Sequence, residues 1–197
     1  MEKGPLDERA INQLFTGART FNSWSDRPVD DSTIRELYAL VASGPTAANA
    51  HPGRFVFIRS SEAKARLRPH LNPGNVDKTM AAPCCVIVGY DTRFFEYMPQ
   101  LFPARDFSAT FAGKDEVIAD TATRSSTLAG AYLILAARAL GLDAGPMSGF
   151  DKQGLEADFF PDGRWKANFL CNIGYGTQGG LFLRNPRLAF EQACLDL

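Results

Sequence analysis

The residues best suited to bind a ligand lie in short stretches far apart along the chain. Arg19, Thr20 and Asn22 place a guanidinium, a hydroxyl and an amide within four residues, a combination suited to a phosphate group. Asn75 and Lys78 are three residues apart, so on a helix they would present a donor and a cation on one face. Each stretch alone also fits an ordinary exposed loop or helix face. Together they indicate binding chemistry without an obvious acid, base or nucleophile.

A second candidate is the sequence GPMSG at residues 145–149, directly after an apolar segment. Pro146 has a fixed φ, whereas Gly145 and Gly149 are conformationally free. Such a rigid loop suits backbone N–H groups that point at a ligand, and we expect residues 146–149 to do so: Pro146, Met147, Ser148 and Gly149. The same residues also fit a tight turn before the next helix.

Two further stretches carry polar groups. The sequence PTAANAHP at residues 45–52 is small, polar and bracketed by prolines. It resembles a wall packed against a flat group, although it also fits a connection from a helix to a strand; its candidate residues are Pro45, Thr46 and Asn49. Arg187 lies near the end of the chain, where it could bind an anion or serve only solubility.

Composition excludes several classes of function. A formal charge of −1 gives no basic surface for nucleic acid or an anionic membrane, and 45% hydrophobic with 22% charged residues is typical of a globular chain. The start, MEKGPLDERA, lacks the apolar segment of a secretory signal. We therefore expect a cytoplasmic protein with free, buried thiols at its four cysteines. Catalysis by Cys84 or Cys85 with His51 or His70 is the alternative for two of these thiols.

Familiar motifs are absent or incomplete. Residues 174–179, GYGTQG, match G-x-G-x-x-G literally. A dinucleotide fingerprint must also open a helix and be followed by an acidic residue about 20 positions later. Here Gly180-Leu181-Phe182 follows instead, so we interpret the match as a glycine-rich turn. Two histidines do not supply a typical zinc site, and we expect no metal.

The length predicts one domain over residues 1–197, and the alternation of helices with short apolar strands indicates an α+β or α/β layered domain. The expected helices cover residues 7–15, 61–67, 75–80, 115–140 and 151–159, with another from residue 31 that ends at Gly44-Pro45. The expected strands are 54–58, 84–90 and 168–174, and an aromatic-rich segment spans 93–111. The second half of the longest helix is apolar all round and rich in alanine, so it must be covered on every side.

In this order, the stretches resemble the nitroreductase family of flavin enzymes over nearly the whole chain. ARTFNSW is similar to the family's R-S-x-R-x-F, GPTAANAHP to P-S-x-x-N-x-Q-P, and NVDK to N-x-x-K before a strand. GLDAGPMSGF resembles G-L-G-x-x-P-x-x-G, and PRLAFEQA resembles the closing R-L-P-L-E-E. Within the family the chain looks closest to the malonic semialdehyde reductases (3-hydroxypropionate dehydrogenases) of pyrimidine breakdown.

The resemblance implies an FMN-binding homodimer with a mostly antiparallel sheet, its long central helix at the dimer interface and the flavin between subunits. Arg19, Thr20 and Arg187 would hold the phosphate, while Asn75 and Lys78 would contact the pyrimidine edge. Pro45, Thr46 and Asn49 would come from the partner chain, and residues 146–149 would face flavin N5 and O4. Asn22 and Asn185 stand where the family usually has basic residues, so we expect fewer cations at the phosphate; His51 replaces the usual glutamine.

The expected activity is reduction of malonic semialdehyde by NADPH or NADH in a ping-pong cycle, with the chemistry carried by FMN. The substrate carboxylate would need a cation, and the candidates are Arg93, Arg105 and Arg124. Two alternatives remain: a nitroaromatic or quinone reductase of the same family, and a flavin-binding dimer without useful turnover.

Overall fold

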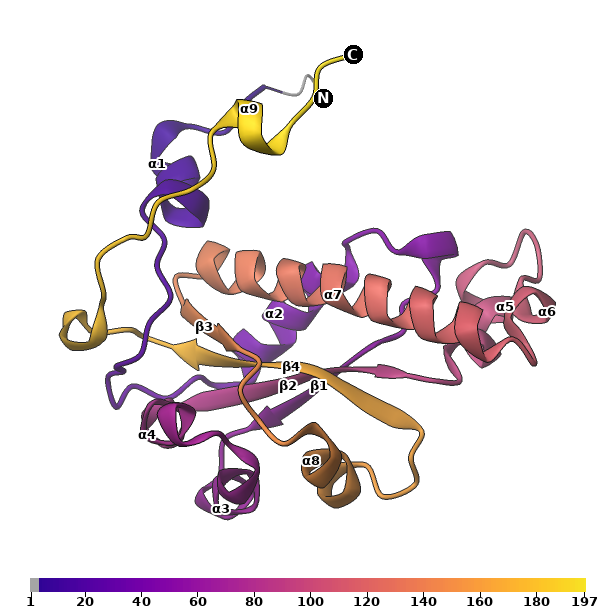
Figure 1. Cartoon of the computed structure of the whole chain (residues 1–197), viewed down its shortest axis with the longest axis horizontal. Helices are drawn as coiled ribbons and strands as arrows, with labels where there is room; N and C mark the ends of the chain where they lie inside the picture. Colours follow the sequence, from indigo (N-terminus) through magenta and orange to yellow (C-terminus); the bar gives the residue numbers. More distant parts are fainter. Residues whose placement is uncertain (1–3) are drawn as a thin grey trace.

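Four antiparallel strands form the centre of the protein in the computed structural model, which describes residues 4–197. They are β1 (Gly53–Ile58), β2 (Cys84–Asp91), β3 (Asp143–Met147) and β4 (Trp165–Gly174), and the sheet order is β1-β2-β4-β3 (Figure 1). Every strand pair is antiparallel. The expected α+β architecture with an antiparallel central sheet is confirmed.

Helices cover both faces of the sheet (Figure 1). One face carries α2 (Asp31–Ala42) and α7 (Asp115–Ala139), and the other carries α3 (Ser61–Leu67), α4 (Pro73–Ala81) and α8 (Lys152–Phe159). Because alternate strand residues point to opposite faces, Val86 and Val88 of β2 pack towards α2 and α7, while Cys85 and Ile87 pack with the α3 and α8 side. The continuous apolar run of β2 therefore reflects burial on both faces.

The aromatic-rich segment closes one end of this core. It contains a 3-10 turn (Phe94–Tyr97) and the short helices α5 (Met98–Leu101) and α6 (Ser108–Phe111). Phe94, Met98 and Phe111 are buried with Ile118 and Ala122 of α7. The segment therefore consists of short turns and helices only.

The two terminal segments lie beyond α7, away from the sheet (Figure 1). They contain α1 (Glu8–Ile11), which continues as a π-helical turn (Asn12–Thr16), and α9 (Phe190–Ala193) after an irregular stretch. Asp7 caps α1, its carboxylate accepting from the Ala10 N–H at 2.7 Å. These segments expose large apolar side chains: Leu6, Phe15, Phe182, Leu183, Leu188 and Phe190.

The structure corrects four expectations. The helix expected over residues 7–15 changes to π-helical winding at Asn12, and β4 begins three residues earlier than expected, at Trp165. Cys194 is exposed, whereas Cys84, Cys85 and Cys171 are buried. The apolar half of α7 is not covered on every side within one chain, because Leu128 remains 42% exposed. Within residues 4–197, no helix combines the length and apolarity needed to cross a membrane.

Candidate functional site

A cavity of about 410 Å³ brings together residues from both ends of the chain and from the end of α7. Strand-like pairing positions its N-terminal wall: the Phe21 N–H donates to the Ala144 carbonyl of edge strand β3 at 3.2 Å, and Thr20 bridges Ala144 in parallel. The cavity is lined by all four candidate phosphate-binding residues, Arg19, Thr20, Asn22 and Arg187. Residues more than 160 positions apart thus meet at one place.

This cavity, which we call the arginine cavity, also contains two arginines that the sequence interpretation missed, Arg138 and Arg184. The Arg19 guanidinium donates to the Phe182 carbonyl. Arg184 donates to the carbonyls of Thr16 and Ala18 at 2.8 and 2.9 Å. None of the described residues lining the cavity is acidic. The cavity as a whole thus contains four arginines, Arg19, Arg138, Arg184 and Arg187, beside Asn22 and Asn185.

One signal could have identified Arg138 beforehand. It is the single charged residue between Leu128 and Leu140, in a helix half that is otherwise apolar. Its Nη1 donates to the Leu14 carbonyl at 2.9 Å, whereas its Nε is buried without a hydrogen-bond partner. A buried donor of a charged group without a partner is costly, and here it borders a cavity.

A second group of candidates lies further along the same edge of the sheet. The Asn75 amide donates to the Gly149 carbonyl at 2.7 Å, and the Asn72 N–H donates to the same carbonyl at 3.1 Å. The Trp24 indole N–H donates to the Lys78 carbonyl at 3.1 Å. The segment from Thr20 to Trp24 thus runs from the arginine cavity to the Lys78 carbonyl.

Lys78 lies half-buried in α4. The hydrogen bonds that involve Lys78 use its backbone carbonyl, which accepts from Trp24 and Asn172. Desolvation lowers the pKa of the Lys78 ammonium, because burial disfavours the charged form. A negatively charged ligand beside Lys78 would offset this cost.

The expected loop over residues 145–149 is partly wrong, because Gly145, Pro146 and Met147 belong to β3. Pro146 has no N–H to offer, and Met147 is buried in the core with its sulfur 3.6 Å from the Thr79 hydroxyl. Only Ser148 and Gly149 follow the strand. Their carbonyls accept hydrogen bonds from Phe150 and Asn72, so their N–H groups are the ones that can face a ligand.

The segment of residues 45–52 has an unusual backbone. Ala48, Asn49 and His51 have φ angles of 49°, 53° and 40°, a left-handed conformation that costs a non-glycine residue about 1–3 kcal/mol. Thr46 compensates by accepting the His51 N–H at 3.1 Å. Such strain concentrates at functional sites.

Asn49 links this segment to the aromatic segment. Its amide nitrogen donates to the Leu101 carbonyl at 2.7 Å, so its oxygen faces His51 Nε2 at 2.7 Å. His51 Nε2 therefore carries the proton in this pair. Thr46 and His51 line a cavity beside β1, with Tyr38 and Gly53. Within one chain, this wall does not border the arginine cavity.

The three candidate substrate arginines are not brought together. Arg93 pairs with Glu96, Arg105 lies over the Phe107 ring at 4.8 Å, and Arg124 pairs with Asp120 at 2.6 Å on the exposed side of α7. Arg93 lines a different cavity of about 490 Å³, together with Lys152 and Lys166. The structure thus favours none of the three for a carboxylate.

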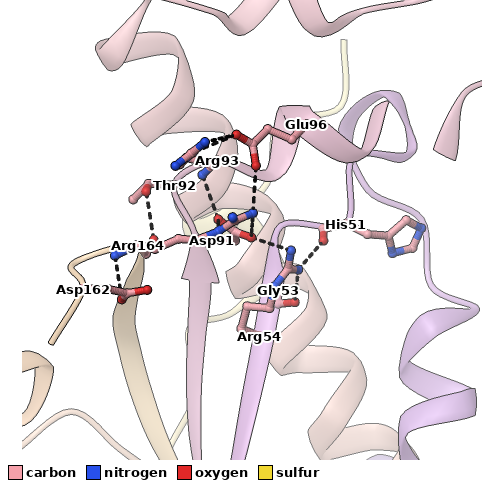
Figure 2. A network of polar contacts seen from close by, with 9 residues as sticks. All are labelled: His51, Gly53, Arg54, Asp91, Thr92, Arg93, Glu96, Asp162 and Arg164. Carbon is pink, nitrogen blue, oxygen red and sulfur yellow. Dashed lines mark hydrogen bonds and ion pairs between the residues drawn. The ribbon is translucent and has the colours of Figure 1, made fainter. Parts of the chain in front are cut away.

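Figure 2 shows why Arg93 is a poor candidate for a free cation. Its backbone N–H donates to Asp91 at 2.8 Å, and Glu96, which it pairs with, also contacts Arg164 at 3.1 Å. Asp91 is 1% exposed and binds Arg54 and Arg164 at 2.8 and 2.9 Å. This network joins the ends of β1, β2 and β4 to the aromatic segment.

The buried thiols do not support nucleophilic catalysis. Cys84 and Cys85 are fully buried, and burial raises the pKa of Cys84 to about 12. A reactive cysteine needs an accessible thiolate. His51 and His70 pair instead with Asn49 and Asp158.

Comparison with known proteins agrees with the arrangement of these segments. The sequence model of the nitroreductase family matches residues 17–175. The chain belongs to the nitroreductase family. A protein of Rhodopseudomonas palustris is 66% identical over 189 residues, which cover 96% of each chain. A protein of Burkholderia lata is 57% identical over 186 residues, covering 94% of this chain and 95% of the relative. Both carry the provisional name NADH dehydrogenase/NAD(P)H nitroreductase.

A solved structure shows the same fold. A nitroreductase-like protein of Exiguobacterium sibiricum, crystallised in complex with FMN, superposes with a TM-score of 0.85 at 20% identity, covering 100% of both chains. Because the identity is low, this match establishes the nitroreductase fold of the chain and nothing finer. The expected fold is confirmed.

Proposed function

We propose that this protein is a homodimeric, FMN-dependent oxidoreductase that uses NAD(P)H to reduce malonic semialdehyde to 3-hydroxypropionate. The observation that carries the proposal is the arginine cavity, whose N-terminal wall pairs with β3 and reaches the Lys78 carbonyl through Trp24. An anion site joined to a polar edge suits a phosphorylated, planar cofactor. The provisional names of the relatives and the FMN complex of the similar structure support the same cofactor and donor.

The residues present fit FMN at both ends. Arg19, Thr20, Asn22 and Arg187 would hold the phosphate, whose charge of about −2 needs the unopposed guanidinium groups of the cavity. Asn75 and Lys78 would bind the pyrimidine edge, where the Lys78 ammonium stabilises negative charge. The N–H groups of Ser148 and Gly149 would face N5, and Pro146 and Met147 would serve as the strand that positions them.

Bound FMN would supply hydride chemistry, accepting a hydride from NAD(P)H and passing it to the aldehyde after the coenzyme has left. The chain's own task is to bind and orient: the arginine cavity fixes one end, and the pair of Asn75 and Gly149 fixes the other. The sequence resemblance supports malonic semialdehyde as substrate. Its carboxylate would need Arg93, Arg105 or Arg124, and each of these would have to leave its present contact.

The homodimer is supported by surfaces that one chain leaves uncovered. Thr127, Leu128 and Ala131 form an exposed stripe on α7, although this helix half is mostly apolar. Leu188 and Phe190 of the C-terminal segment are 70% and 63% exposed. Pro45, Thr46 and Asn49 do not border the arginine cavity of their own chain, so they are free to complete the site of a partner.

The names of the relatives favour a second candidate, reduction of nitroaromatic compounds or quinones. Steady-state rates with malonic semialdehyde and with a nitrofuran, each with NADH and NADPH, separate the two. We expect a higher kcat/KM for malonic semialdehyde. A higher kcat/KM for the nitrofuran would indicate that nitro compounds, and not aldehydes, are the substrate class. Bound FMN that neither coenzyme reduces would instead indicate a flavin-binding dimer without turnover.

A further inference from the structure

We propose that Arg138 and Arg184 bind the phosphate of the flavin mononucleotide directly and replace the cations lost at Asn22 and Asn185. This inference rests on the proposed FMN site. It assigns a binding role to a residue of the long helix, far in sequence from the segments that resemble the family's phosphate motif. It also makes selectivity for FMN over riboflavin a property of these two arginines.

The first argument comes from the hydrogen-bonding capacity of Arg138. Of its guanidinium donors, Nη1 is used by the Leu14 carbonyl at 2.9 Å, and Nε is buried without a partner. A guanidinium offers five donors in a planar fork that matches a phosphate. Because Arg138 lines the arginine cavity, a phosphate oxygen there can accept from guanidinium donors that the Leu14 carbonyl does not use.

The second argument comes from charge. Arg19, Arg138, Arg184 and Arg187 all line one cavity of about 410 Å³, and none of its described lining residues is acidic. Burial lowers the pKa of Arg138, and the charge of Arg184 acts in the same direction, whereas the Asp143 carboxylate acts in the opposite one. Four like charges around one space repel one another, so a dianion in that space would relieve the repulsion.

The third argument is that backbone contacts hold both arginines in place. Arg184 donates through Nη2 to Thr16 and Ala18 at 2.8 and 2.9 Å, which leaves its other donors available. Arg138 donates through Nη1 to the Leu14 carbonyl at 2.9 Å. A guanidinium fixed before the ligand arrives loses little conformational entropy on binding.

A structural role is the competing explanation. Arg138 lies in the last turn of α7, where a cation interacts favourably with the helix dipole, and it anchors the π-helical turn through Leu14. Riboflavin separates the two roles because it has the same ring system as FMN and lacks the phosphate. A structural defect would weaken the binding of both flavins, whereas loss of a phosphate contact would weaken only that of FMN.

The test is titration of apoprotein with FMN and with riboflavin, followed by quenching of flavin fluorescence. For Arg138→Gln and Arg184→Gln we expect the FMN Kd to rise about tenfold to a hundredfold, as for loss of a charge-assisted hydrogen bond, while the riboflavin Kd stays unchanged. Arg35→Gln is the matched control, because Arg35 is an exposed arginine of α2 outside the arginine cavity. It should leave both Kd values unchanged.

Unchanged FMN binding in both variants, or an equal loss of riboflavin binding, would overturn the inference. If wild-type apoprotein binds neither flavin, the proposed cofactor itself is wrong.

Thermal unfolding with added inorganic phosphate then remains a direct readout of the anion site. Phosphate should raise the Tm of wild type and of Arg35→Gln but not of Arg138→Gln, and an equal rise in all three would contradict the assignment. If Arg138→Gln does not fold, Arg138→Lys keeps the charge and loses the fork, and it should weaken FMN binding selectively.

Discussion

Gly149 tests the placement of the flavin ring at the scale of a single residue. A Cβ on Gly149 would lie 2.6 Å from the Asn75 amide nitrogen and 3.1 Å from that of Asn72. Both obstacles are ends of side chains, so Gly149→Val should fold, but Asn75 must leave the position in which it binds the Gly149 carbonyl.

We therefore expect purified Gly149→Val to be colourless and still dimeric, as measured by visible absorbance and gel filtration. Gly179→Val is the control, because no atom lies within 4 Å of a Cβ at Gly179, and it should stay yellow. A yellow Gly149→Val protein would show that the residues after β3 do not face the flavin.

Lys78 tests the electrostatics of the same edge. Its ammonium should stabilise the anionic reduced flavin, so Lys78→Met should lower the flavin midpoint potential by tens of millivolts, since about 30 mV corresponds to 1.4 kcal/mol for two electrons. Lys78→Arg keeps the charge, so its flavin midpoint potential should lie close to that of wild type. The measurement is a redox titration of the bound flavin, and equal potentials in wild type and Lys78→Met would contradict the role.

The binding residues were predictable where they occur in short, recognisable stretches. Arg19, Thr20, Asn22 and Arg187 were expected together, and the structure places them around one cavity. Arg138 could not be assigned in the same way, because its place beside the cavity depends on how the end of α7 packs against the N-terminal segment. Residue type alone did not reveal that contact.

At the scale of elements, α7 carries the proposed dimer interface. Ala131 is exposed on the face of α7 opposite its buried Leu133, whereas Ala157 is exposed on α8 on the other side of the sheet. Ala131→Glu would place an unpaired charge in the interface, where its burial is costly. We expect a monomer without bound flavin by analytical ultracentrifugation, whereas Ala157→Glu should remain a yellow dimer. A dimeric Ala131→Glu protein would exclude this face as the interface.

The Asp91 network tests how the strands hold the aromatic segment in place (Figure 2). Burial alone would raise the pKa of Asp91, but hydrogen bonds from the Arg164 side chain and the Arg93 N–H lower it below its ordinary value. Asp91→Asn removes the charge that pairs with the half-buried Arg54 and Arg164, so the free energy of unfolding should fall by about 1–3 kcal/mol. Denaturant unfolding at neutral pH measures this, with the exposed pair variant Asp120→Asn as a control expected to change little.

The pH dependence of this difference has a definite sign. A folded pKa below the unfolded value means that Asp91 stabilises the fold at pH values above the unfolded pKa and loses this contribution as the pH falls through the folded pKa. The difference in free energy of unfolding between wild type and Asp91→Asn should therefore shrink in acid, below the ordinary aspartate pKa of 3.8. A gap that stays constant into strong acid would show that the Asp91 charge is not what stabilises the network.

The helices and strands were largely predictable because their apolar patterns are strong, at helical spacing in α2 and as a continuous run in β2. Residues 145–149 were assigned to a loop because proline and two glycines usually interrupt a strand. The structure tolerates Pro146 in β3 because β3 lies at the edge of the sheet, where a missing N–H can face away from the ladder. Only the pairing of β3 with β4 shows that Gly145, Pro146 and Met147 form a strand and not a loop.

At the scale of the whole molecule, the order of the segments identified the fold, but the site is assembled from parts that a linear pattern cannot place. The arginine cavity joins both ends of the chain, and the wall of residues 45–52 lies beside β1. In the proposed dimer the two would meet across the interface, which would account for the apolar terminal segments and the strained loop that one chain exposes.

The most direct test of the central claim is one anaerobic titration of the protein purified with its flavin. We predict that NADPH or NADH bleaches the visible flavin absorption, and that adding malonic semialdehyde, but not buffer, restores it. Recovery with a nitrofuran and not with malonic semialdehyde would contradict the proposed substrate. Protein that stays colourless after incubation with FMN would contradict the whole account.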